Sequence, residues 1–505
     1  MSIFNSVISW FMKKRIHQIE LFMKYPNEVQ EEWFENLIMG AENTEWGKKH
    51  HYKSIENLND YRERVPIQTY DSLKPYIERM LKGEQNVLWQ SEVRWFAKSS
   101  GTTSDRSKFI PVSEEALEEC HFKGGKDALT IYYNNRPDAK LFSGKSLTIG
   151  GSQQVSQFSP ETSFGDLSAV IMKNLPFWAE FGRTPNLDIA LLDNFEEKIE
   201  KIAKTTLDVN VTGIGGVPTW NIVLFNRILE LTGKDNMLEI WPNLEFCFHG
   251  GVSFTPYREQ FKKLIPTDRM YYLESYNASE GYFGIQDQVQ HGDMLLMLDY
   301  GIFYEFLPVE HMHDENPKTL TLDEVELGKN YALIITTNAG LWRYMIGDTV
   351  KFTSLSPYRI QISGRTKHYI NTFGEEVIID NAERALEEAC KNTGAIIRDY
   401  TAAPVYFDGR QCGAHEWLIE FVKPPAEFER FVDILDETLR QINSDYDAKR
   451  FKDMALRRPI VRRVAEGTFF NWLKEKGKLG GQNKVPRLAN DREYVDAILR
   501  MLEPA

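Results

Sequence analysis

Short apolar runs alternate with helical patterns through the middle of the chain, and this alternation restricts the fold more than any other feature. A helical pattern lies in "PTWNIVLFNRILELTG" (218–233), where apolar residues recur at spacings of three and four. The strand-like runs are "KSLTIGG" (145–151), "LDIALL" (187–192), "LEFCFHGG" (244–251), "DMLLMLDYGIFYEFLP" (293–308) and "NYALIITTN" (330–338). Strands mixed with helices in this way predict an α/β protein with mixed sheets.

The length of the chain predicts more than one domain. At 505 residues it exceeds what one hydrophobic core normally supports, so we expect two domains. The pattern changes after Gly364, where "GRTKHYINTFGEEVIIDNAERALEEACKNTG" (364–394) begins a strand-then-helix unit. We place the boundary at Arg365, with a large N-terminal domain over residues 1–365 and a small C-terminal α+β domain over residues 366–505.

Charge and cysteine content exclude several kinds of partner. The chain has 60 Lys and Arg against 73 Asp and Glu, a formal net charge of −13 that repels nucleic acid and anionic membranes. Its four cysteines include no CxxC pair, which favours free thiols in a reducing cytoplasm. No basic leader opens the sequence, and no stretch approaches the roughly 18 apolar residues needed to cross a bilayer. We therefore expect a cytoplasmic protein with small-molecule partners.

A hydroxyl-rich loop, "KSSGTTSDRSKFIPVS" (98–113), follows an alternating strand pattern that starts at Val93. A Walker-type loop has a glycine directly before its lysine and a helix after it, whereas strand-like residues follow Lys108. The segment therefore predicts a strand, a flexible loop and a strand. Its hydroxyls and its lysine suit a phosphate chain, which makes candidates of Ser99, Ser100, Thr102, Thr103 and Lys108. A solvated hairpin turn with a surface lysine fits the same residues.

Three other patterns fit known motifs less well. In "VNVTGIGGVPTW" (209–220), Pro218 interrupts the glycine spacing of a dinucleotide-binding fold. Ser279 comes within one residue of a nucleophile elbow, but an elbow leads into a helix and "GYFGIQ" (281–286) favours a strand, so a hydrolase is disfavoured. His311, His313 and Asp314 offer metal ligands, although a solvated loop explains them as well.

Five segments in order resemble one known family. They are "SSGTT" (99–103), "YNASEGYFGI" (276–285), "YEFLP" (304–308), "WRYMIGD" (342–348) and "NKVPR" (483–487). Together they resemble the auxin-responsive acyl-acid amido synthetases, as a bacterial-type member, within the firefly-luciferase-like adenylate-forming superfamily. The resemblance spans nearly the whole chain. It implies a luciferase-like fold with a large N-terminal α/β domain and a small mobile C-terminal α+β domain.

The resemblance also implies an activity. Such a protein is an ATP-dependent ligase that adenylates a carboxylic acid and conjugates it to an amino acid through an amide bond, with release of AMP and pyrophosphate. The expected cofactors are ATP and Mg²⁺, the expected partners are a carboxylic acid and an amino acid, and the expected oligomeric state is a monomer. A thioester-forming acyl-CoA ligase and a non-catalytic nucleotide-binding protein stay open as alternatives.

Acidic and aromatic candidates lie in the second and fourth of these segments. Glu280 is the expected Mg²⁺ ligand, because an oxygen ligand beside phosphates suits that ion. Tyr276 is a candidate to stack on adenine, and Ser279 belongs to the same nucleotide-binding segment. In the family, the aspartate at the position of Asp348 accepts both ribose hydroxyls. Each of these residues also has an alternative without a functional role: Glu280 as a solvated glutamate, Tyr276 as a core residue and Asp348 as part of a Gly-Asp β-turn.

Basic candidates follow from the resemblance. Arg365 and Lys367 lie where the superfamily has its interdomain hinge, so a charged side chain there can exchange environments as the small domain rotates. Lys484 resembles the lysine that reaches the α-phosphate and the carboxylate during adenylation. Arg343 is expected to neutralise phosphate or the adenylate. For a lone lysine, a solvated surface position is the alternative.

Overall fold

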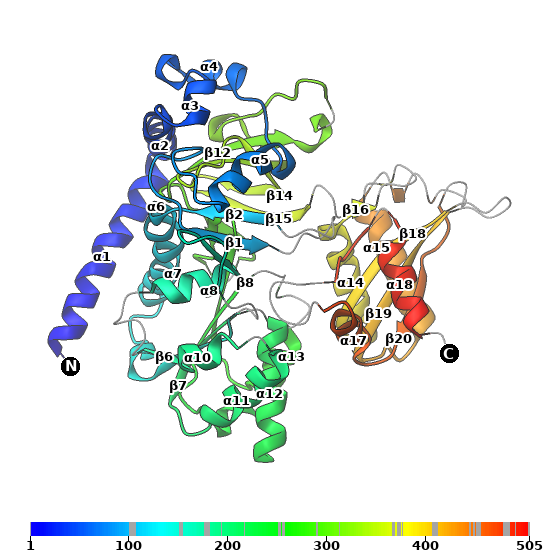
Figure 1. Cartoon of the computed structure of the whole chain (residues 1–505). Coiled ribbons are helices and arrows are strands. Elements are labelled where there is room, and N and C mark those ends of the chain that lie inside the picture. The colour runs from blue at the N-terminus through cyan, green and yellow to red at the C-terminus, as the bar shows by residue number, and fades with distance from the viewer. Residues whose placement is uncertain are drawn as a thin grey trace.

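The computed structural model describes residues 2–99, 108–150, 155–175, 182–192, 194–216, 218–250, 254, 258–288, 291–312, 314–365, 369–370, 375, 377–406, 413–443, 446–447, 450, 456–477, 485–489 and 491–502. Figure 1 shows the helices and strands through β15 in one body and those from β16 onward in a second, smaller body. None of the helices in these ranges is both long and apolar enough to cross a membrane.

A large mixed sheet runs through the first body. Within the described residues it has 11 strands, of which β6, β3, β7, β8 and β9 are parallel. The strands from β9 to β12 pair in antiparallel fashion. In sheet order they are β12 (Ile302–Pro308), β13 (Asn330–Thr337), β14 (Tyr344–Leu355), β15 (Tyr358–Arg365), β11 (Met294–Leu296), β10 (Gly281–Ile285), β9 (Tyr271–Ala278), β8 (Phe246–Gly250), β7 (Val211–Gly216), β3 (Lys145–Thr148) and β6 (Arg183–Thr184). The predicted α/β class with mixed sheets is confirmed.

Helices precede this sheet and connect its strands. Pro26 starts a new helix, because proline is tolerated in the first turn but not in a helix interior. Pro218 likewise starts the predicted helix that follows β7. The helices of this body are α1 (Ser2–Lys24), α2 (Pro26–Ala41), α3 (Glu45–Lys49), α4 (Leu58–Arg64), α5 (Tyr70–Leu81), α6 (Glu114–Ala116), α7 (Lys123–Asn135), α8 (Leu167–Asn174), α10 (Leu187–Ala190), α11 (Phe195–Thr205), α12 (Pro218–Thr232) and α13 (Arg258–Leu264).

One predicted strand is wrong. The run "LDIALL" forms the short helix α10, which Asn186 caps by accepting a hydrogen bond from the Ile189 N–H at 3.1 Å. A run of five apolar residues and one aspartate is too short for its period to separate a strand from a buried helical turn, and the Asn186 cap favours the helix. The other four strand-like runs form β3, β8, β11 with β12, and β13, as expected.

A second, smaller sheet holds the strands around the hydroxyl-rich loop. Its order is β2 (Lys108–Val112), β1 (Trp95–Ser99), β5 (Ser163–Gly165) and β4 (Ser156–Gln157). β1 and β2 are antiparallel, and their ladder ends at the pair Ser99 and Lys108. Both predicted strands are confirmed, and because a strand and not a helix follows at Lys108, so is the argument against a Walker-type loop. Residues 100–107 lie outside the described part of the chain.

The smaller body has its own sheet and its own apolar clusters. The sheet consists of β18 (Ile396–Val405), β19 (Ala414–Lys423) and β20 (Ile460–Val464). Beside it lie the two-stranded ladder β16 (Tyr369–Ile370) with β17 (Val377–Ile378) and the helices α14 (Ile379–Thr393), α15 (Phe428–Ile442), α17 (Thr468–Glu475) and α18 (Glu493–Leu502). The buried apolar residues of its main cluster come from Ile370 onward in the sequence, and those of the main cluster of the larger body come from residues up to Ile360. The two bodies therefore have separate hydrophobic cores.

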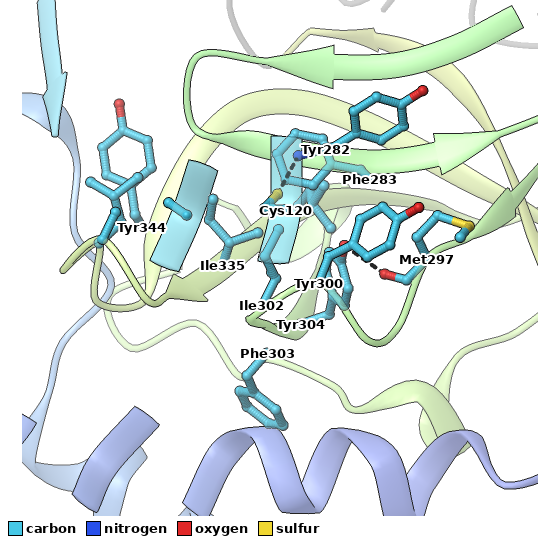
Figure 2. Packing of buried hydrophobic residues seen from close by; sticks show 14 of the residues in the cluster. Cys120, Tyr282, Phe283, Met297, Tyr300, Ile302, Phe303, Tyr304, Ile335 and Tyr344 are labelled. Carbon is cyan, nitrogen blue, oxygen red and sulfur yellow. Dashed lines mark hydrogen bonds between the residues drawn. The ribbon is translucent and has the colours of Figure 1, made fainter. Parts of the chain in front are cut away.

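Two hydrogen bonds inside the core of the larger body involve main-chain groups. Figure 2 shows Cys120 beneath Tyr282, whose backbone N–H donates to the cysteine sulfur at 3.1 Å. In the same view the Tyr304 hydroxyl donates to the Met297 carbonyl at 3.1 Å. Three of the four cysteines are free thiols, as expected from their spacing, and Cys412 lies outside the described residues.

Candidate active site

The candidate site lies where the parallel half of the large sheet meets its antiparallel half. β7, β8 and β9 run parallel, so their carboxyl ends share one edge of the sheet. In open α/β sheets, ligands bind at the carboxyl ends of the strands. β9 then turns directly into the antiparallel strand β10 through Ser279 and Glu280. The segment that carries Tyr276, Ser279 and Glu280 therefore occupies the edge where a ligand is expected.

A buried hydrogen bond joins two of the predicted nucleotide-binding residues. The Tyr276 hydroxyl donates to Asp348 Oδ2 at 2.8 Å, although the two residues are 72 positions apart. Both side chains are buried, at 4% and 6% exposure. The Tyr276 ring also packs against Phe283, with 4.8 Å between the ring centroids. A carboxylate has about four acceptor positions, so Asp348 can hold Tyr276 and still accept hydroxyl groups of a ligand.

Asp348 is held by a strand and not by a β-turn. It lies within β14, directly after Gly347, whose φ of 97° is a conformation that favours glycine. In the β14–β15 register Asp348 pairs with Arg365, the residue predicted at the hinge. The structure therefore brings the backbone of Arg365 next to Asp348. The side chain of Arg365 and the whole of Lys367 lie outside the described residues.

Lys108 and Glu280 reach the same corner of the site through two tyrosines. The Lys108 ammonium lies 5.6 Å from the centroid of the Tyr70 ring, and the Tyr70 hydroxyl accepts a hydrogen bond from the Phe109 N–H at 2.9 Å. Burial, followed by the charge of Glu280 and the proximity of Tyr70, raises the pKa of the Tyr344 hydroxyl. Tyr344 therefore lies within electrostatic range of both Glu280 and Tyr70, the tyrosine whose ring faces Lys108.

Glu280 fits a magnesium ion that shares its coordination with phosphate. It is half-buried in the turn between β9 and β10. In the part of the chain that the structure describes, no group of three His, Cys, Asp or Glu side chains forms a cage for a metal ion. Mg²⁺ usually takes only one or two carboxylates and completes its shell with phosphate oxygens and water, so a single glutamate beside a polyphosphate is sufficient.

Several predicted residues cannot be placed. Ser99 ends β1, but its side chain is outside the described set, as are the following residues: Ser100, Thr102, Thr103 and Lys484. Their roles remain predictions. Ser279 is described and is buried in the turn before β10. Because a strand follows it, the argument against a nucleophile elbow is confirmed.

Arg343 has a structural role, and its predicted role in phosphate binding is wrong. Its guanidinium is 4% exposed and donates to both oxygens of Glu305, at 2.9 and 3.2 Å. The remaining donors reach Thr319 Oγ1 at 2.9 Å and the carbonyl oxygens of Val65 and Arg62 at 2.7 and 3.2 Å. All five N–H groups are therefore used inside the core. Sequence reasoning could not detect this, because Glu305 and Val65 are distant along the chain.

The histidine-rich loop supports the solvated alternative. His311 Nδ1 lies 2.9 Å from Asp314 Oδ2, and both side chains are more than half exposed. His313 lies outside the described residues.

A row of residues that sequence reasoning missed crosses the carboxyl ends of the parallel strands. Gly216 of β7 pairs with His249 of β8, and His249 pairs with Glu274 of β9. Burial, with the nearby Glu383 adding to it and Arg258 opposing it, raises the pKa of Glu274 to about 7. Burial lowers the pKa of His249 to about 3, so this imidazole is neutral at physiological pH. The available signal in the sequence was a histidine at the end of the apolar strand β8 and a glutamate within β9.

The fold and the site define a class of protein, and comparison with known proteins narrows it to a family. The large mixed sheet followed by a small C-terminal body is a fold that solved ligases share. A 2-hydroxyisobutyryl-CoA ligase solved with 2-HIB-AMP has this fold, with a TM-score of 0.57, 13% identity and coverage of 94% of this chain and 90% of that one. Residues 15–270, 295–365 and 380–493 match the N-terminal, central and C-terminal domains of the GH3 family. The chain belongs to the GH3 family.

Individual relatives are similar over nearly the full length. An indole-3-acetic acid-amido synthetase, GH3.3 of Arabidopsis thaliana, is 24% identical, with 94% of this chain and 91% of the relative covered. A jasmonoyl-L-amino acid synthetase, JAR4 of Nicotiana attenuata, is 22% identical over 66% of this chain and 68% of its own. The structure of the AtGH3.15 acyl acid amido synthetase in complex with 2,4-DB gives a TM-score of 0.79 at 17% identity and covers 97% of this chain and 96% of that one.

Proposed function

We propose that this protein is an acyl-acid amido synthetase that adenylates a carboxylic acid with ATP and conjugates the acyl group to an amino acid. Membership of the GH3 family supports the reaction class, and the named relatives conjugate acids to amino acids. The observation that carries the proposal for this chain is the buried Tyr276–Asp348 hydrogen bond at the ligand-binding edge of the sheet. It fixes a carboxylate acceptor where the ribose of a nucleotide would lie.

The residues of the chain divide between the two ends of the nucleotide. Asp348 accepts the ribose hydroxyls, with Arg365 beside it on β15, and Tyr276 lines the adenine end together with Ser279. Lys108 and the hydroxyl-rich loop at Ser99, Ser100, Thr102 and Thr103 hold the phosphates. During the first step the carboxylate of the acid attacks the α-phosphorus and pyrophosphate leaves, so negative charge develops on phosphoryl oxygens. Fixed cations and N–H or O–H donors stabilise such charge.

Magnesium and the small body complete the proposal. Glu280 would hold Mg²⁺, which supplies neutralisation of the phosphate charge when bound. Lys484 reaches the α-phosphate and the carboxylate from the C-terminal domain, and Lys367 acts at the hinge. We place the domain boundary at residues 365 and 366, at the end of β15. Rotation of residues 366–505 about that point would exchange the groups that face the reacting atoms.

The test is an analysis of products. The purified protein is incubated with ATP, Mg²⁺, a pool of carboxylic acids and a pool of amino acids, and nucleotides and amides are separated by chromatography with mass detection. Acid-dependent AMP and pyrophosphate, with an amide that needs the amino acid, support the proposal. AMP release that needs coenzyme A identifies a thioester-forming ligase, and nucleotide binding without any product identifies a non-catalytic protein.

A further inference from the structure

An ion pair joins the two bodies close to the proposed hinge. The Lys351 ammonium, on β14 of the larger body, donates a hydrogen bond to Asp380 Oδ2 at 3.1 Å. Asp380 lies in the first turn of α14, the first helix of the smaller body. The two side chains are 21% and 23% exposed, so both keep some contact with solvent. The pair therefore crosses from one hydrophobic core to the other at a partly solvated place.

The backbone beside this pair is closely packed. A Cβ atom at Gly364 would lie 3.6 Å from the Cβ of Ile378 and 3.5 Å from the nitrogen of Ile379, so the glycine lets the start of α14 approach β15 closely. In the same place the Ser363 hydroxyl donates to the Thr349 hydroxyl oxygen at 3.1 Å and joins β15 to β14. The start of α14 therefore rests on these two strands, directly before the point where the larger body ends.

The helix α14 also faces the candidate site. Glu383, one turn beyond Asp380, acts electrostatically on Glu274 of β9. Lys351 follows the proposed ribose ligand, Asp348, by three residues on β14. In Figure 1, α14 lies on the side of the smaller body that faces the larger one. A contact that orients α14 therefore also orients the smaller body toward the nucleotide.

We propose that Lys351 and Asp380 are positioning residues, which hold the smaller body in the orientation of this structure and separate when that body rotates for the other half-reaction. The inference rests on the proposed function, in which adenylation and conjugation need different groups at the reacting atoms. It adds the contact that sets the balance between the two orientations. A contact made in only one of two states shifts the population toward that state by its own free energy.

The distance of the pair from the hinge requires it to break on rotation. In the β14–β15 ladder Lys351 is opposite Gln361, which precedes Arg365 by four residues, or about 13 Å along the strand. Asp380 contacts Lys351, so it lies at a similar distance from the hinge. A rotation of about 45° at Arg365 moves a group at that distance by about 10 Å. This displacement exceeds the length of a lysine side chain, so the ion pair cannot persist in both orientations.

The strength of the pair suits a contact that opens in every reaction cycle. An ion pair at a protein surface changes an equilibrium by a factor of up to about five, whereas breaking a fully buried pair is far more unfavourable. Because Lys351 and Asp380 are partly exposed, water can solvate both charges when the pair opens. The pair therefore favours one orientation without fixing it.

The experiment measures the two half-reactions separately in the full-length protein, with the acid and the amino acid that the product analysis identifies. Single-turnover release of pyrophosphate reports adenylation, and amide formation from preformed acyl-adenylate reports conjugation. We expect Lys351→Met to change the ratio of the two rate constants about fivefold, because one orientation loses population to the other. Added salt moves the wild-type ratio in the same direction, since it screens the pair, and Lys351→Met loses this dependence.

Reversal of the two charges gives an independent test. Asp380→Lys places two ammonium groups together, so it moves the ratio further than Lys351→Met and in the same direction. Combining Lys351→Glu with Asp380→Lys restores an ion pair of opposite polarity, and we expect a ratio within about twofold of wild type. Lys391→Met is the matched control, because it removes a charge of α14 whose partner, Glu388, lies on the same helix. This control keeps the wild-type ratio.

The outcomes distinguish the two proposals. A wild type without acid-dependent release of pyrophosphate defeats the proposed function and this inference with it. Intact half-reactions with a wild-type ratio in both Lys351→Met and Asp380→Lys overturn the positioning role alone. A changed ratio that the reversed pair does not restore also overturns it. If the doubly substituted protein does not fold, a salt dependence in Lys351→Met equal to that of wild type overturns the role instead.

Discussion

The buried ion pair between Arg343 and Glu305 permits a quantitative test, because it opposes the phosphate-binding role that the sequence predicted. Arg343→Met preserves the length of the side chain but removes all five donors. Glu305 is 1% exposed and retains Arg62 at 3.0 Å and Thr319 at 2.5 Å. Removing one partner of a buried pair costs about 3–5 kcal/mol, and the remaining Arg62 places this case near about 3 kcal/mol.

The assay is urea unfolding followed by circular dichroism. With a denaturant slope of about 3 kcal/mol per molar, a loss of about 3 kcal/mol lowers the midpoint of the transition that reports the larger body by about 1 M. At 20 °C the folded variant keeps KM for ATP within about threefold of wild type, because Arg343 does not reach the nucleotide.

Arg79→Met is the matched control for this experiment. Arg79 pairs with Glu45 and Glu84 on the surface, where an ion pair is worth at most about 1 kcal/mol. A midpoint for Arg343→Met that equals the midpoint for Arg79→Met, together with a KM for ATP raised tenfold or more, would refute the structural role of Arg343.

Three further predictions concern the site. Tyr276→Phe removes a hydrogen bond to the buried carboxylate of Asp348. Steady-state kinetics should therefore show KM for ATP raised about tenfold or more and KM for the amino acid unchanged. A KM for ATP equal to that of wild type would contradict the contact with Asp348. Glu274→Gln should be more stable than wild type at pH 8 and equally stable at pH 4. The pKa of Glu274 is raised to about 7 in the folded state, so this carboxyl lowers the stability of the wild type as pH rises from about 4.5 through 7. Thermal unfolding at both pH values measures the difference, and a gain in stability confined to pH 4 would contradict the prediction. Lys484→Ala should lower acid-dependent AMP formation at least a hundredfold while ATP binding, measured by calorimetry, changes little; wild-type turnover would remove Lys484 from the mechanism.

The sequence predicted most of the secondary structure because the decisive information was local. Pro218 starts the predicted helix at a position where proline is favoured, and β13 is an apolar run rich in β-branched residues, which favours a buried strand. The prediction for the run that became α10 was wrong because the run is short and mostly apolar, so that only the Asn186 cap distinguished the helix from a strand.

Interactions between distant segments could not be predicted in the same way. The order of motifs indicated that Tyr276 and Asp348 belong to one site, but their hydrogen bond depends on how β9 and β14 are placed in the sheet. For Arg343 the order of motifs gave a wrong prediction. This arginine lies in a motif that the resemblance assigns to the site, but in the structure it neutralises Glu305 in the core. Glu274 belongs to no motif, because its raised pKa comes from burial in the folded chain and from Glu383 of α14, which is 109 residues away in the sequence.

The most direct test of the account is the nucleotide product that forms when the protein receives ATP, Mg²⁺, a carboxylic acid and an amino acid, measured beside an Asp348→Asn variant. The account predicts AMP and pyrophosphate only when the acid is present, an amide only when the amino acid is added, and a sharp loss of both in the variant. ADP and phosphate in place of AMP and pyrophosphate would indicate acyl-phosphate chemistry and would contradict the central claim.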